Sequence, residues 1–488
     1  MRYDVVVIGS GLGGLICAQL LSRAGRSVIV LERQAQLGGC LQSYRRNGLS
    51  FDTGFHYVGG LAEGQRLHRI FEHLGLMSLP WHRMDADGFD QVTIGSKTYA
   101  FAEGYKPFVE TLAAHFPKER RALESYVDTL QQTERVAFGS SDIFSLYGMS
   151  AYDYLKSTFH DPLLINVLSG TALKMELREQ SLPLFTFAHG NSSYIQSSWR
   201  LKGSGELIVG ALADEIRANG GEIVTQAEVE ELIERDGRME GVRCSDGRVF
   251  EAGLVISDIH PALTFQMVKE SRCLKELFRR RISAMENSFG MFTASMVLKP
   301  QTLRYFNHNK FVYAKPNVWT FHEDAGGVGG VMVSCRVPED GDYARQLDLL
   351  TPMPWEHCLR WKDTAVCRRG DEYVAMKERM TAECLQLAER AIPGLSRMVE
   401  KCYASTPLTW RDYNSTPDGS AYGVRKDCRN LVLTVLSPRT PIPQLLLTGQ
   451  NLMLHGLEGV AMTALQTCAE VLGKEYVENI LCCEVERR

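Results

Sequence analysis

The sequence predicts an α/β fold in which a parallel-sheet domain is interrupted by an inserted domain of α+β character. At the amino end, a strand, a glycine-rich turn, a helix and a second strand follow one another directly. Residues 203–258 and 443–480 show a similar α/β sequence pattern. Between them, residues from about 105 to 200 are helical in pattern and rich in Phe, Tyr, Leu and Met. One domain is therefore assembled from three stretches of chain, and a second from what lies between.

Composition narrows the function classes. The chain has 488 residues, 44% hydrophobic content and a formal net charge of −4, a balance that argues against broad nucleic-acid binding. No signal peptide or run of about 18 apolar residues is found, so no spanning helix is expected. The 13 cysteines are scattered without a C-x-x-C pair. This pattern favours reduced thiols in the cytoplasm and predicts no metal site.

The first strand and the first helix flank a glycine-rich motif that is typical of dinucleotide binding. In VVVIGSGLGGLICAQLLSRAGRSVIVLER we predict a strand at residues 5–8, a helix at about 12–24 and a strand at 27–31. Gly9, Gly11 and Gly14 fit G-x-G-x-x-G, which allows a tight turn, close approach of a pyrophosphate and close helix packing. Glu32 ends the second strand, where a carboxylate can hold a ribose and disfavours a 2′-phosphate. The adenosine of FAD or NAD suits this site.

The following elements favour FAD. A second pair, Gly38 and Gly39, follows Glu32 closely and suits the ribityl chain and flavin. Farther on, Asp236–Gly237 and Asp246–Gly247 stand between alternating runs, which predicts a three-stranded meander. A buried strand at residues 254–257 follows it. These observations together predict a Rossmann-like FAD-binding domain with a three-stranded β-meander, plus an inserted α+β substrate domain.

The remaining elements complete the two domains. We predict strands within GMFTASMVLK and GGVMVSCRV, a long helix at DEYVAMKERMTAECLQLAERAI, and a strand at residues 445–448 before a glycine-rich turn and the last helix. The predicted FAD-binding domain comprises residues 1–75, 200–265 and 440–488. The predicted substrate domain comprises residues 76–199 and 266–439.

The chain resembles the phytoene-desaturase-type branch of the FAD-dependent amine-oxidase-like superfamily. That branch includes carotenoid desaturases, carotenoid isomerases and all-trans-retinol 13,14-reductases (retinol saturases). The resemblance rests on DVVVIGSGLGGLICAQLLSRAGRSVIVLER, LGGCLQSYRRNGLSFDTGFHYVGG, LKGSGELIVGALADEIRANGGEIVTQAEVEEL, GLVISDIHP and LLLTGQNLMLHGLEGVAMTAL. It implies an FAD-dependent oxidoreductase acting on carbon–carbon double bonds of a polyene or isoprenoid-type lipid, as a saturase, desaturase or isomerase, with NAD(P)H as a candidate electron donor.

The resemblance also implies roles for individual residues. The pyrophosphate would contact Gly9, Ser10, Gly11, Gly13 and Gly14. The adenosine would be held by Glu32, Arg33 and the backbone of Val229, and the ribityl and flavin lined by Gly38, Gly39 and Cys40. FDTGFHYVGG would run beside the flavin ring, and the last turn and helix would contribute Gly449, Gln450, Gly459, Val460, Ala461 and Met462.

Two departures from the family pattern tilt the expectation toward a saturase or isomerase. Gln450, followed by Asn451, stands where these families often carry an acid for the ribityl hydroxyls; amides can make the same hydrogen bonds. His455–Gly456 replaces the proline–glycine pair that carotenoid desaturases often carry before the last helix.

Three side chains are candidate catalytic groups. His455 and Glu458 begin the last helix, and either could protonate the carbanion left by hydride addition to a double bond. Both residues can also have a purely structural role at the start of the helix, where an acid such as Glu458 is favoured. His56, beside the predicted flavin, is a candidate acid or base or simply a packed imidazole.

The aromatic-rich segment 143–199 predicts an apolar substrate tunnel or a helical core, and an exposed part of it could contact a membrane peripherally. Some of its aromatic residues are expected to face the substrate: Phe144, Tyr147, Tyr152, Phe185, Phe187 and Tyr194. Two alternative functions remain for this fold, a flavin amine oxidase and a non-catalytic escort protein for prenyl lipids. The sequence specifies neither the substrate nor the oligomeric state.

Overall fold

Strands from the beginning, middle and end of the chain form the first sheet. The computed structural model describes residues 2–136, 142–320 and 327–482. Within them, a seven-stranded sheet has the order β10-β2-β1-β13-β12-β11, with β19 also paired to β13. Its strands are β1 (Arg2–Ile8), β2 (Val28–Leu31), β10 (Glu222–Val224), β11 (Val229–Arg235), β12 (Arg238–Cys244), β13 (Val249–Ser257) and β19 (Leu445–Leu447). This confirms the predicted α/β fold.

The pairing combines a parallel core with the predicted meander. β10, β2, β1, β13 and β19 pair in parallel, whereas β11, β12 and β13 pair antiparallel in chain order. The buried strand predicted separately at residues 254–257 is the carboxyl half of β13, because Gly253 stays extended within one nine-residue strand. The third strand of the meander therefore leads directly into the parallel core.

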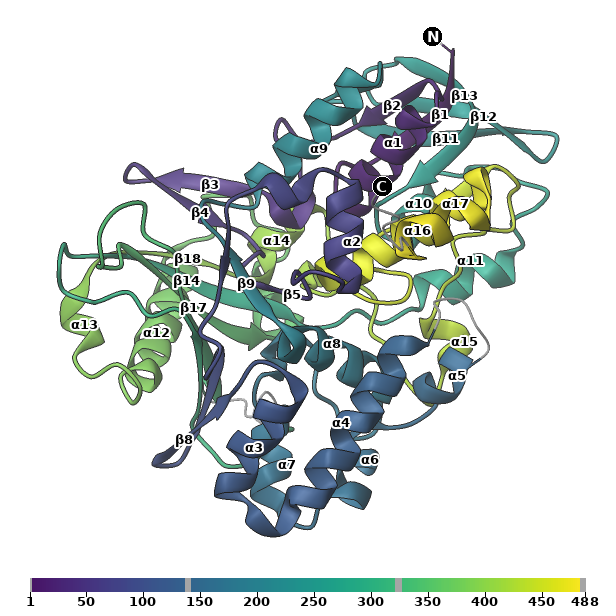
Figure 1. Ribbon diagram of the computed structural model, residues 1–488. Helices are drawn as coiled ribbons and strands as arrows, with labels where there is room; N and C mark the ends of the chain where they lie inside the picture. Colours follow the sequence, from purple (N-terminus) through teal and green to yellow (C-terminus); the bar gives the residue numbers. More distant parts are fainter. Residues whose placement is uncertain (1, 137–141, 321–326, 483–488) are drawn as a thin grey trace.

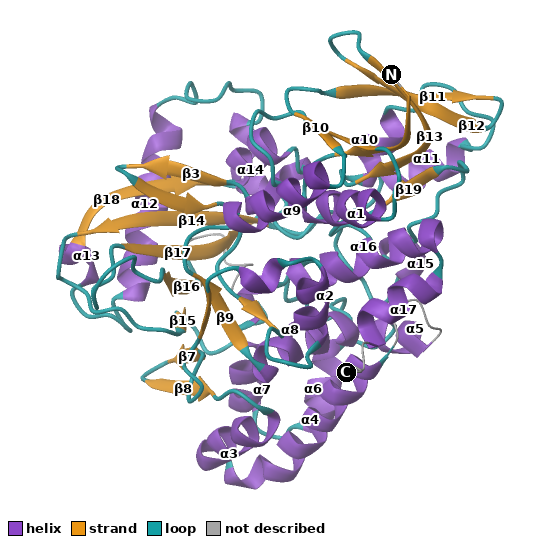
Figure 2. Ribbon diagram, turned by 45° about the horizontal axis from the view of Figure 1, so that its top comes forward, coloured by secondary structure: helices purple, strands orange, loops and turns teal. Residues whose placement is uncertain are grey.

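Both faces of this sheet are covered, as expected for parallel strands. Val5 and Val7 of β1 pack with the helices α1 (Leu12–Arg23), α9 (Glu206–Ala218) and α16 (Gly456–Leu472). Val6 and Ile8, which alternate with them, pack on the opposite face with residues of the meander. The parallel strands consequently read as continuous apolar runs, and the helices α1, α9 and α16 lie beside this sheet (Figure 2).

A second sheet carries the other half of the molecule. Its described strands have the order β18-β14-β17-β16-β15-β7-β8, antiparallel except for the β15–β7 pair. They are β7 (Asp90–Ile94), β8 (Lys97–Phe101), β14 (Gly290–Leu298), β15 (Asn309–Tyr313), β16 (Gly330–Cys335), β17 (Gln346–Met353) and β18 (Val399–Ser405), with α12 (Asp371–Ala388) packed against them.

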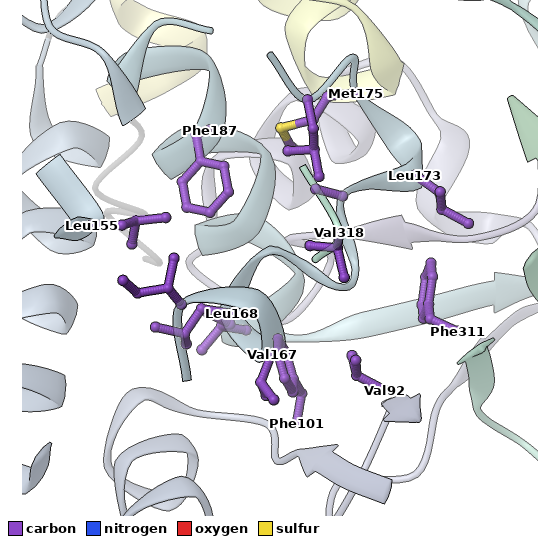
Figure 3. Close-up of a cluster of buried hydrophobic side chains, with 14 of the residues drawn as sticks. Val92, Phe101, Leu155, Val167, Leu168, Leu173, Met175, Phe187, Phe311 and Val318 are labelled. Atoms are coloured by element: carbon purple, nitrogen blue, oxygen red, sulfur yellow. The ribbon is translucent and has the colours of Figure 1, made fainter. Parts of the chain in front are cut away.

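The predicted helical region lies beside this second sheet (Figure 1). It contains α3 (Tyr105–His115), α4 (Arg120–Arg135), α5 (Asp142–Tyr147), α6 (Ala151–Thr158), α7 (Pro162–Ser169), the short 3-10 helix η4 (Ala172–Lys174) and α8 (Leu184–Gln196). Figure 3 shows the shared core, where Val92 and Phe311 from the strands meet Leu155, Leu168 and Phe187 from the helices. Helices and sheet therefore share one hydrophobic core.

The remaining described elements are short. They are β3 (Ser43–Arg46), β4 (Leu49–Asp52), β5 (Val58–Gly59), β6 (Trp81–Arg83), β9 (Ser198–Leu201), α2 (Arg66–His73), α10 (Pro261–Gln266), α11 (Glu276–Ser283), α13 (Leu395–Met398), α14 (Pro407–Asn414), α15 (Leu431–Thr434), α17 (Lys474–Cys482) and the 3-10 helices η1 (Gly39–Leu41), η2 (Leu76–Ser78), η3 (Pro117–Glu119), η6 (Trp355–Trp361) and η7 (Pro417–Gly419). Across the described ranges, no helix combines the length and apolar character needed to cross a bilayer.

Candidate active site

The glycine turn between β1 and α1 presents bare backbone to a cavity. Gly9 has a φ of +93°, a left-handed conformation that suits glycine. Gly11 is the N-cap of α1, makes no side-chain cap, and no acid lies in the first turn. The first turn of this helix thus presents N–H groups that suit an anion, although that of Gly14 donates to Asp258, and the helix dipole favours negative charge there.

The second glycine pair lies directly against the first. Gly38 N donates to Ser10 O at 3.1 Å and to Ser10 Oγ at 3.1 Å. A Cβ on Gly39 would lie 3.3 Å from the Cα of Gly11. The φ values of Gly38 and Gly39 are +114° and +54°. Two segments that are separate in the sequence thus form one backbone cradle, and they approach this closely because Gly11 and Gly39 carry no side chains.

Glu32 is held firmly at the edge of this cradle. Its carboxylate accepts hydrogen bonds from Ser10 N at 2.9 Å, Ser10 Oγ at 2.6 Å and Gln34 N at 2.8 Å. Glu32, Arg33 and Val229 all line the same cavity of about 400 Å³, and Arg33 lies 3.6 Å from Glu228 at its rim. An adenosine can therefore meet a fixed carboxylate beside the meander.

The cradle is supported from behind by Asp258, which sequence reasoning missed. Its carboxylate lies so close that a Cβ on Gly11 would be 2.5 Å from Oδ2, and a Cβ on Gly13 2.7 Å from Oδ1. Burial raises the pKa of Asp258 to about 7, against a hydrogen bond from the Gly14 backbone. The available signal was an acid directly after a buried strand, in GLVISDIHP.

The structure places the other predicted cofactor residues in three groups. Gly9, Ser10, Gly11, Gly13, Gly38, Gly39, Cys40 and Gln450 line the 400 Å³ cavity with the adenosine residues. Gly14 and Gly449 lie behind it, where Gly14 packs on Gly9 and Gly449 on Asp258. On α16, Gly459 and Val460 face a second cavity, whereas Ala461 and Met462 are buried in the helical layer. Gly-rich backbone, a free helix N-terminus and a fixed ribose acceptor together fit FAD.

A second, apolar cavity of about 210 Å³ adjoins the first. Both cavities are lined by Leu12, Cys40, Leu41, Gln450 and Val460. The second is otherwise walled by residues from separate elements, including residues 54–57, β5, η4, α8 and the strands β14, β16 and β17. A substrate in it would lie next to whatever occupies the far end of the first cavity.

The aromatic side chains of this second cavity differ from those predicted. Of the six named above, Tyr194 lines it, whereas Tyr147, Phe185 and Phe187 are fully buried in the core and Phe144 is exposed. Tyr152 packs on Trp319. The other aromatic walls are Phe55, Tyr57, Trp410 and Tyr422, which come from distant segments that helical periodicity alone cannot bring together.

The three candidate catalytic side chains all line this cavity. Burial raises the pKa of Glu458 to about 7, and nearby Arg66 opposes the shift. Its Oε1 lies 3.8 Å from Arg66 Nη1 and 3.7 Å from His189 Nε2. His189, which sequence reasoning did not single out, also lines the cavity. Glu458 is therefore a buried carboxyl group that can gain or lose a proton near neutral pH.

The two histidines are neutral near pH 7. Burial lowers the pKa of His455 to about 4, and its Nε2 lies 2.8 Å from the carbonyl oxygen of Lys174, to which it donates. Burial likewise lowers the pKa of His56 to about 4, although Asp348, 3.9 Å from its Nδ1, acts in the opposite direction. Neutral imidazoles are weak proton donors.

A buried charge cluster connects this cavity to both sheets. Arg336 Nη1 donates to Asp52 Oδ2 at 2.6 Å, and Arg336 Nε lies 3.3 Å from Asp348 Oδ2. Asp52 Oδ1 accepts the N–H of Gly205 at the start of α9, at 2.8 Å. Asp348 is also the acid near His56. The cluster thus joins the second sheet to the α9 side of the first.

Comparisons with known proteins agree with this geometry. The family model for flavin containing amine oxidoreductases matches residues 12–472. All-trans-retinol 13,14-reductase of Rattus norvegicus is 26% identical over 98% of this chain and 87% of its own, and chloroplastic prolycopene isomerase of Arabidopsis thaliana is 25% identical over 86% and 74%. The structure of putrescine oxidase bound to putrescine superposes with a TM-score of 0.69 at 15% identity, covering 97% of this chain and 100% of that one, which shows a shared fold.

Proposed function

Since the chain belongs to the family of flavin-containing amine oxidoreductases, we propose that this FAD-dependent oxidoreductase acts on carbon–carbon double bonds of a polyene or isoprenoid-type lipid. The observation that carries the proposal is the apolar cavity that shares Leu12, Cys40, Leu41, Gln450 and Val460 with the nucleotide cavity. The relatives act on a retinoid and a carotenoid, both long apolar polyenes. Saturation, desaturation and isomerisation all fit this site, and the departures at residues 450 and 455 favour saturation or isomerisation.

We assign the following roles to the residues that line the two cavities. The backbone of the Gly9–Gly14 and Gly38–Gly39 segments would hold the pyrophosphate and ribityl, Glu32 the ribose, and the turn at Gly449–Gln450 the flavin end. FAD, when bound, supplies hydride exchange. The apolar walls orient the polyene and exclude water. Glu458 delivers or accepts a proton, because its pKa of about 7 lies nearer neutrality than those of His455 and His56.

Further parts of the proposal concern the surroundings of the enzyme. NAD(P)H is the proposed electron donor, and residues 1–75, 200–265 and 440–488 are the proposed FAD-binding domain, with residues 76–199 and 266–439 for the substrate. Peripheral membrane contact from the cytoplasmic side suits a lipid substrate, and Leu277 and Val432 are 80% and 75% exposed. Exposed apolar side chains can dock on a bilayer.

The experiment is product analysis with reduced enzyme. Purified protein is reduced anaerobically, incubated with all-trans-retinol or a carotene, and the products are separated by chromatography. A dihydro or isomerised product is expected, and protein stripped of flavin should give none. Unchanged polyenes beside a fully reduced flavin would contradict the proposal. Peroxide released with an amine would favour an amine oxidase, and purified protein without flavin absorbance would favour an escort.

A further inference from the structure

A lysine stands in the wall of the apolar cavity. Lys174 ends η4, and the residues on either side, Leu173 and Met175, belong to the hydrophobic cluster drawn in Figure 3. Leu173, Lys174 and Met175 all line the cavity, beside Met291 and Met332. A purely hydrocarbon substrate would gain nothing from a cation here, because an unpaired charge in apolar surroundings is unfavourable.

The ammonium group of Lys174 rests on aromatic rings rather than on an acid. Its Nζ lies 3.9 Å from the ring centre of Tyr194 and 5.8 Å from that of Tyr57. Among the described residues, no carboxylate oxygen lies within 4.0 Å of it and no hydrogen bond from Nζ is found. Ring faces attract a cation but accept none of its N–H groups in full hydrogen bonds. The donors of Lys174 therefore remain available.

Asp90, the acid whose charge acts on Lys174, accepts hydrogen bonds from other residues. Asp90 Oδ2 accepts a hydrogen bond from Tyr57 at 2.9 Å, and Oδ1 accepts one from Asn309 at 2.9 Å. Its field opposes the effect of burial, which lowers the pKa of Lys174 to about 8. Lys174 is thus mostly protonated at pH 7, with its charge partly offset at a distance.

A second buried lysine shows what a purely structural role looks like. Lys426 Nζ donates to the carbonyl oxygens of Thr434 at 2.8 Å, Asn451 at 2.8 Å and Leu452 at 2.9 Å. Each of its three N–H groups has an acceptor. Lys174 has none of these bonds, yet its backbone is fixed, because its carbonyl oxygen accepts the hydrogen bond from His455. The side chain is held in place with its donors free for a ligand.

We propose that Lys174 binds an anionic end group of the substrate, so that the enzyme takes polyene carboxylic acids in preference to alcohols and hydrocarbons. This inference rests on the proposed function, since it places a polyene in the same cavity. A carboxylate supplies both the counter-charge and the acceptors that the ammonium lacks. The aromatic rings of Tyr194 and Tyr57 then flank the ion pair, and the polyene extends along the apolar walls.

The test is equilibrium binding, measured by quenching of protein fluorescence, with all-trans-retinoic acid, all-trans-retinol and β-carotene. The acid is expected to bind most tightly to the unaltered enzyme. Lys174→Met keeps the length of the side chain and removes the charge; it should weaken binding of the acid by about 10- to 100-fold, the value of a charge-assisted hydrogen bond, and leave retinol unchanged. Lys174→Arg should restore most of the preference for the acid.

Lys156→Met is the matched control. Lys156 also lies over a tyrosine ring, 5.3 Å from the centre of Tyr152, but it is exposed and outside the cavity. Equal loss of acid and alcohol affinity in Lys174→Met, or undiminished acid binding, would overturn the inference. Flavin absorbance and melting temperature report whether each variant is folded. Product analysis on the same samples tests the proposed function separately, because binding is measured without turnover.

Discussion

The two adjoining cavities are built in opposite ways. The nucleotide cavity has bare backbone at the place where its two glycine segments meet, at Gly9, Gly11, Gly38 and Gly39. The apolar cavity is formed by side chains, brought together from segments spread over the whole chain. The nucleotide cavity should therefore be damaged mainly by substitutions that add atoms, and the apolar cavity mainly by substitutions that remove or neutralise side chains.

Their electrostatics differ in part. The nucleotide cavity offers the fixed partial charges of peptide groups and a helix terminus, beside one buried acid, Asp258, whose pKa burial also raises to about 7. The apolar cavity holds ionisable groups whose charged forms are disfavoured by burial: the pKa of Glu458 rises to about 7 and that of Lys174 falls to about 8. Groups that titrate near neutrality are suited to proton transfer and to recognition of a charged ligand.

The largest effect is expected from adding atoms to Gly11. In Gly11→Val the new Cβ would lie 2.5 Å from Asp258 Oδ2, so the backbone turn that would hold the pyrophosphate would have to shift. Flavin should fall to background in the purified protein, as measured by absorbance. Gly210→Ala in α9 is the control: a Cβ there meets nothing within 4 Å, so flavin should be kept and the helix stabilised by up to about 1 kcal/mol. Full flavin content in Gly11→Val would refute the comparison.

Neutralising Glu458 tests the other cavity. If this group delivers the proton, Glu458→Gln should lower the rate of double-bond reduction by about 10²- to 10⁴-fold without loss of flavin. Since the pKa of Glu458 is about 7, the unaltered enzyme holds the proton below pH 7. Its rate should therefore fall about tenfold per pH unit above that value, and the variant should lack this decline. A variant with the same alkaline decline would assign the proton to another group.

The same substitution has a consequence for stability. The folded-state pKa of Glu458 is raised above its ordinary value of 4.5, so the folded protein binds this proton more tightly than the unfolded chain. The contribution of Glu458 to the free energy of unfolding therefore decreases as pH rises from about 4.5 to about 7 and is constant above it. Glu458→Gln should remove this part of the pH dependence in denaturant titrations.

The contrast between the cavities also explains what the sequence could predict. A turn with bare glycines and an acid at the end of the next strand is local along the chain, so Gly9, Gly11 and Glu32 could be placed from spacing alone. Lys174 and His189 carry no such signal, because their role depends on how η4 and α8 pack against α16. The aromatic set was predicted only in part for the same reason: Tyr194 lines the cavity, Phe185 and Phe187 lie in the core, and Tyr57 and Tyr422 reach the cavity from distant segments.

Substitution of Arg336 tests whether the buried charge cluster stabilises the contact between the two halves of the molecule. Burial disfavours its charged form, but the carboxylates of Asp52 and Asp348 outweigh that effect and raise its pKa. Arg336→Met would leave both buried acids without their cation, at a cost of about 3–5 kcal/mol in the free energy of unfolding. Chemical denaturation measures this loss. The control is Arg360→Met, because Arg360 pairs with Glu372 at an exposed site, 60% and 78% accessible, where a pair contributes about 0–1 kcal/mol. Equal small losses in both variants would show that the cluster does not hold the halves together.

The smallest effect is expected where a side chain assists the backbone cradle. Glu32→Gln keeps one side-chain oxygen, which can accept either from Ser10 or from Gln34 but not from both, because these bonds end on different oxygens of the carboxylate; it also loses the charge offered to a ribose hydroxyl. The dissociation constant of FAD should therefore rise only about 10-fold, as expected for a charge-assisted hydrogen bond reduced to a neutral one. Titration of flavin-free protein, followed by flavin fluorescence, measures this dissociation constant.

Glu228→Gln is the matched control, since Glu228 and Arg33 form an accessible pair at the rim, 51% and 39% exposed, and its effect should stay below about twofold. A loss in Glu32→Gln as complete as that in Gly11→Val would mean that the nucleotide cavity depends on this carboxylate as strongly as on bare backbone, and the contrast between the two cavities would no longer hold.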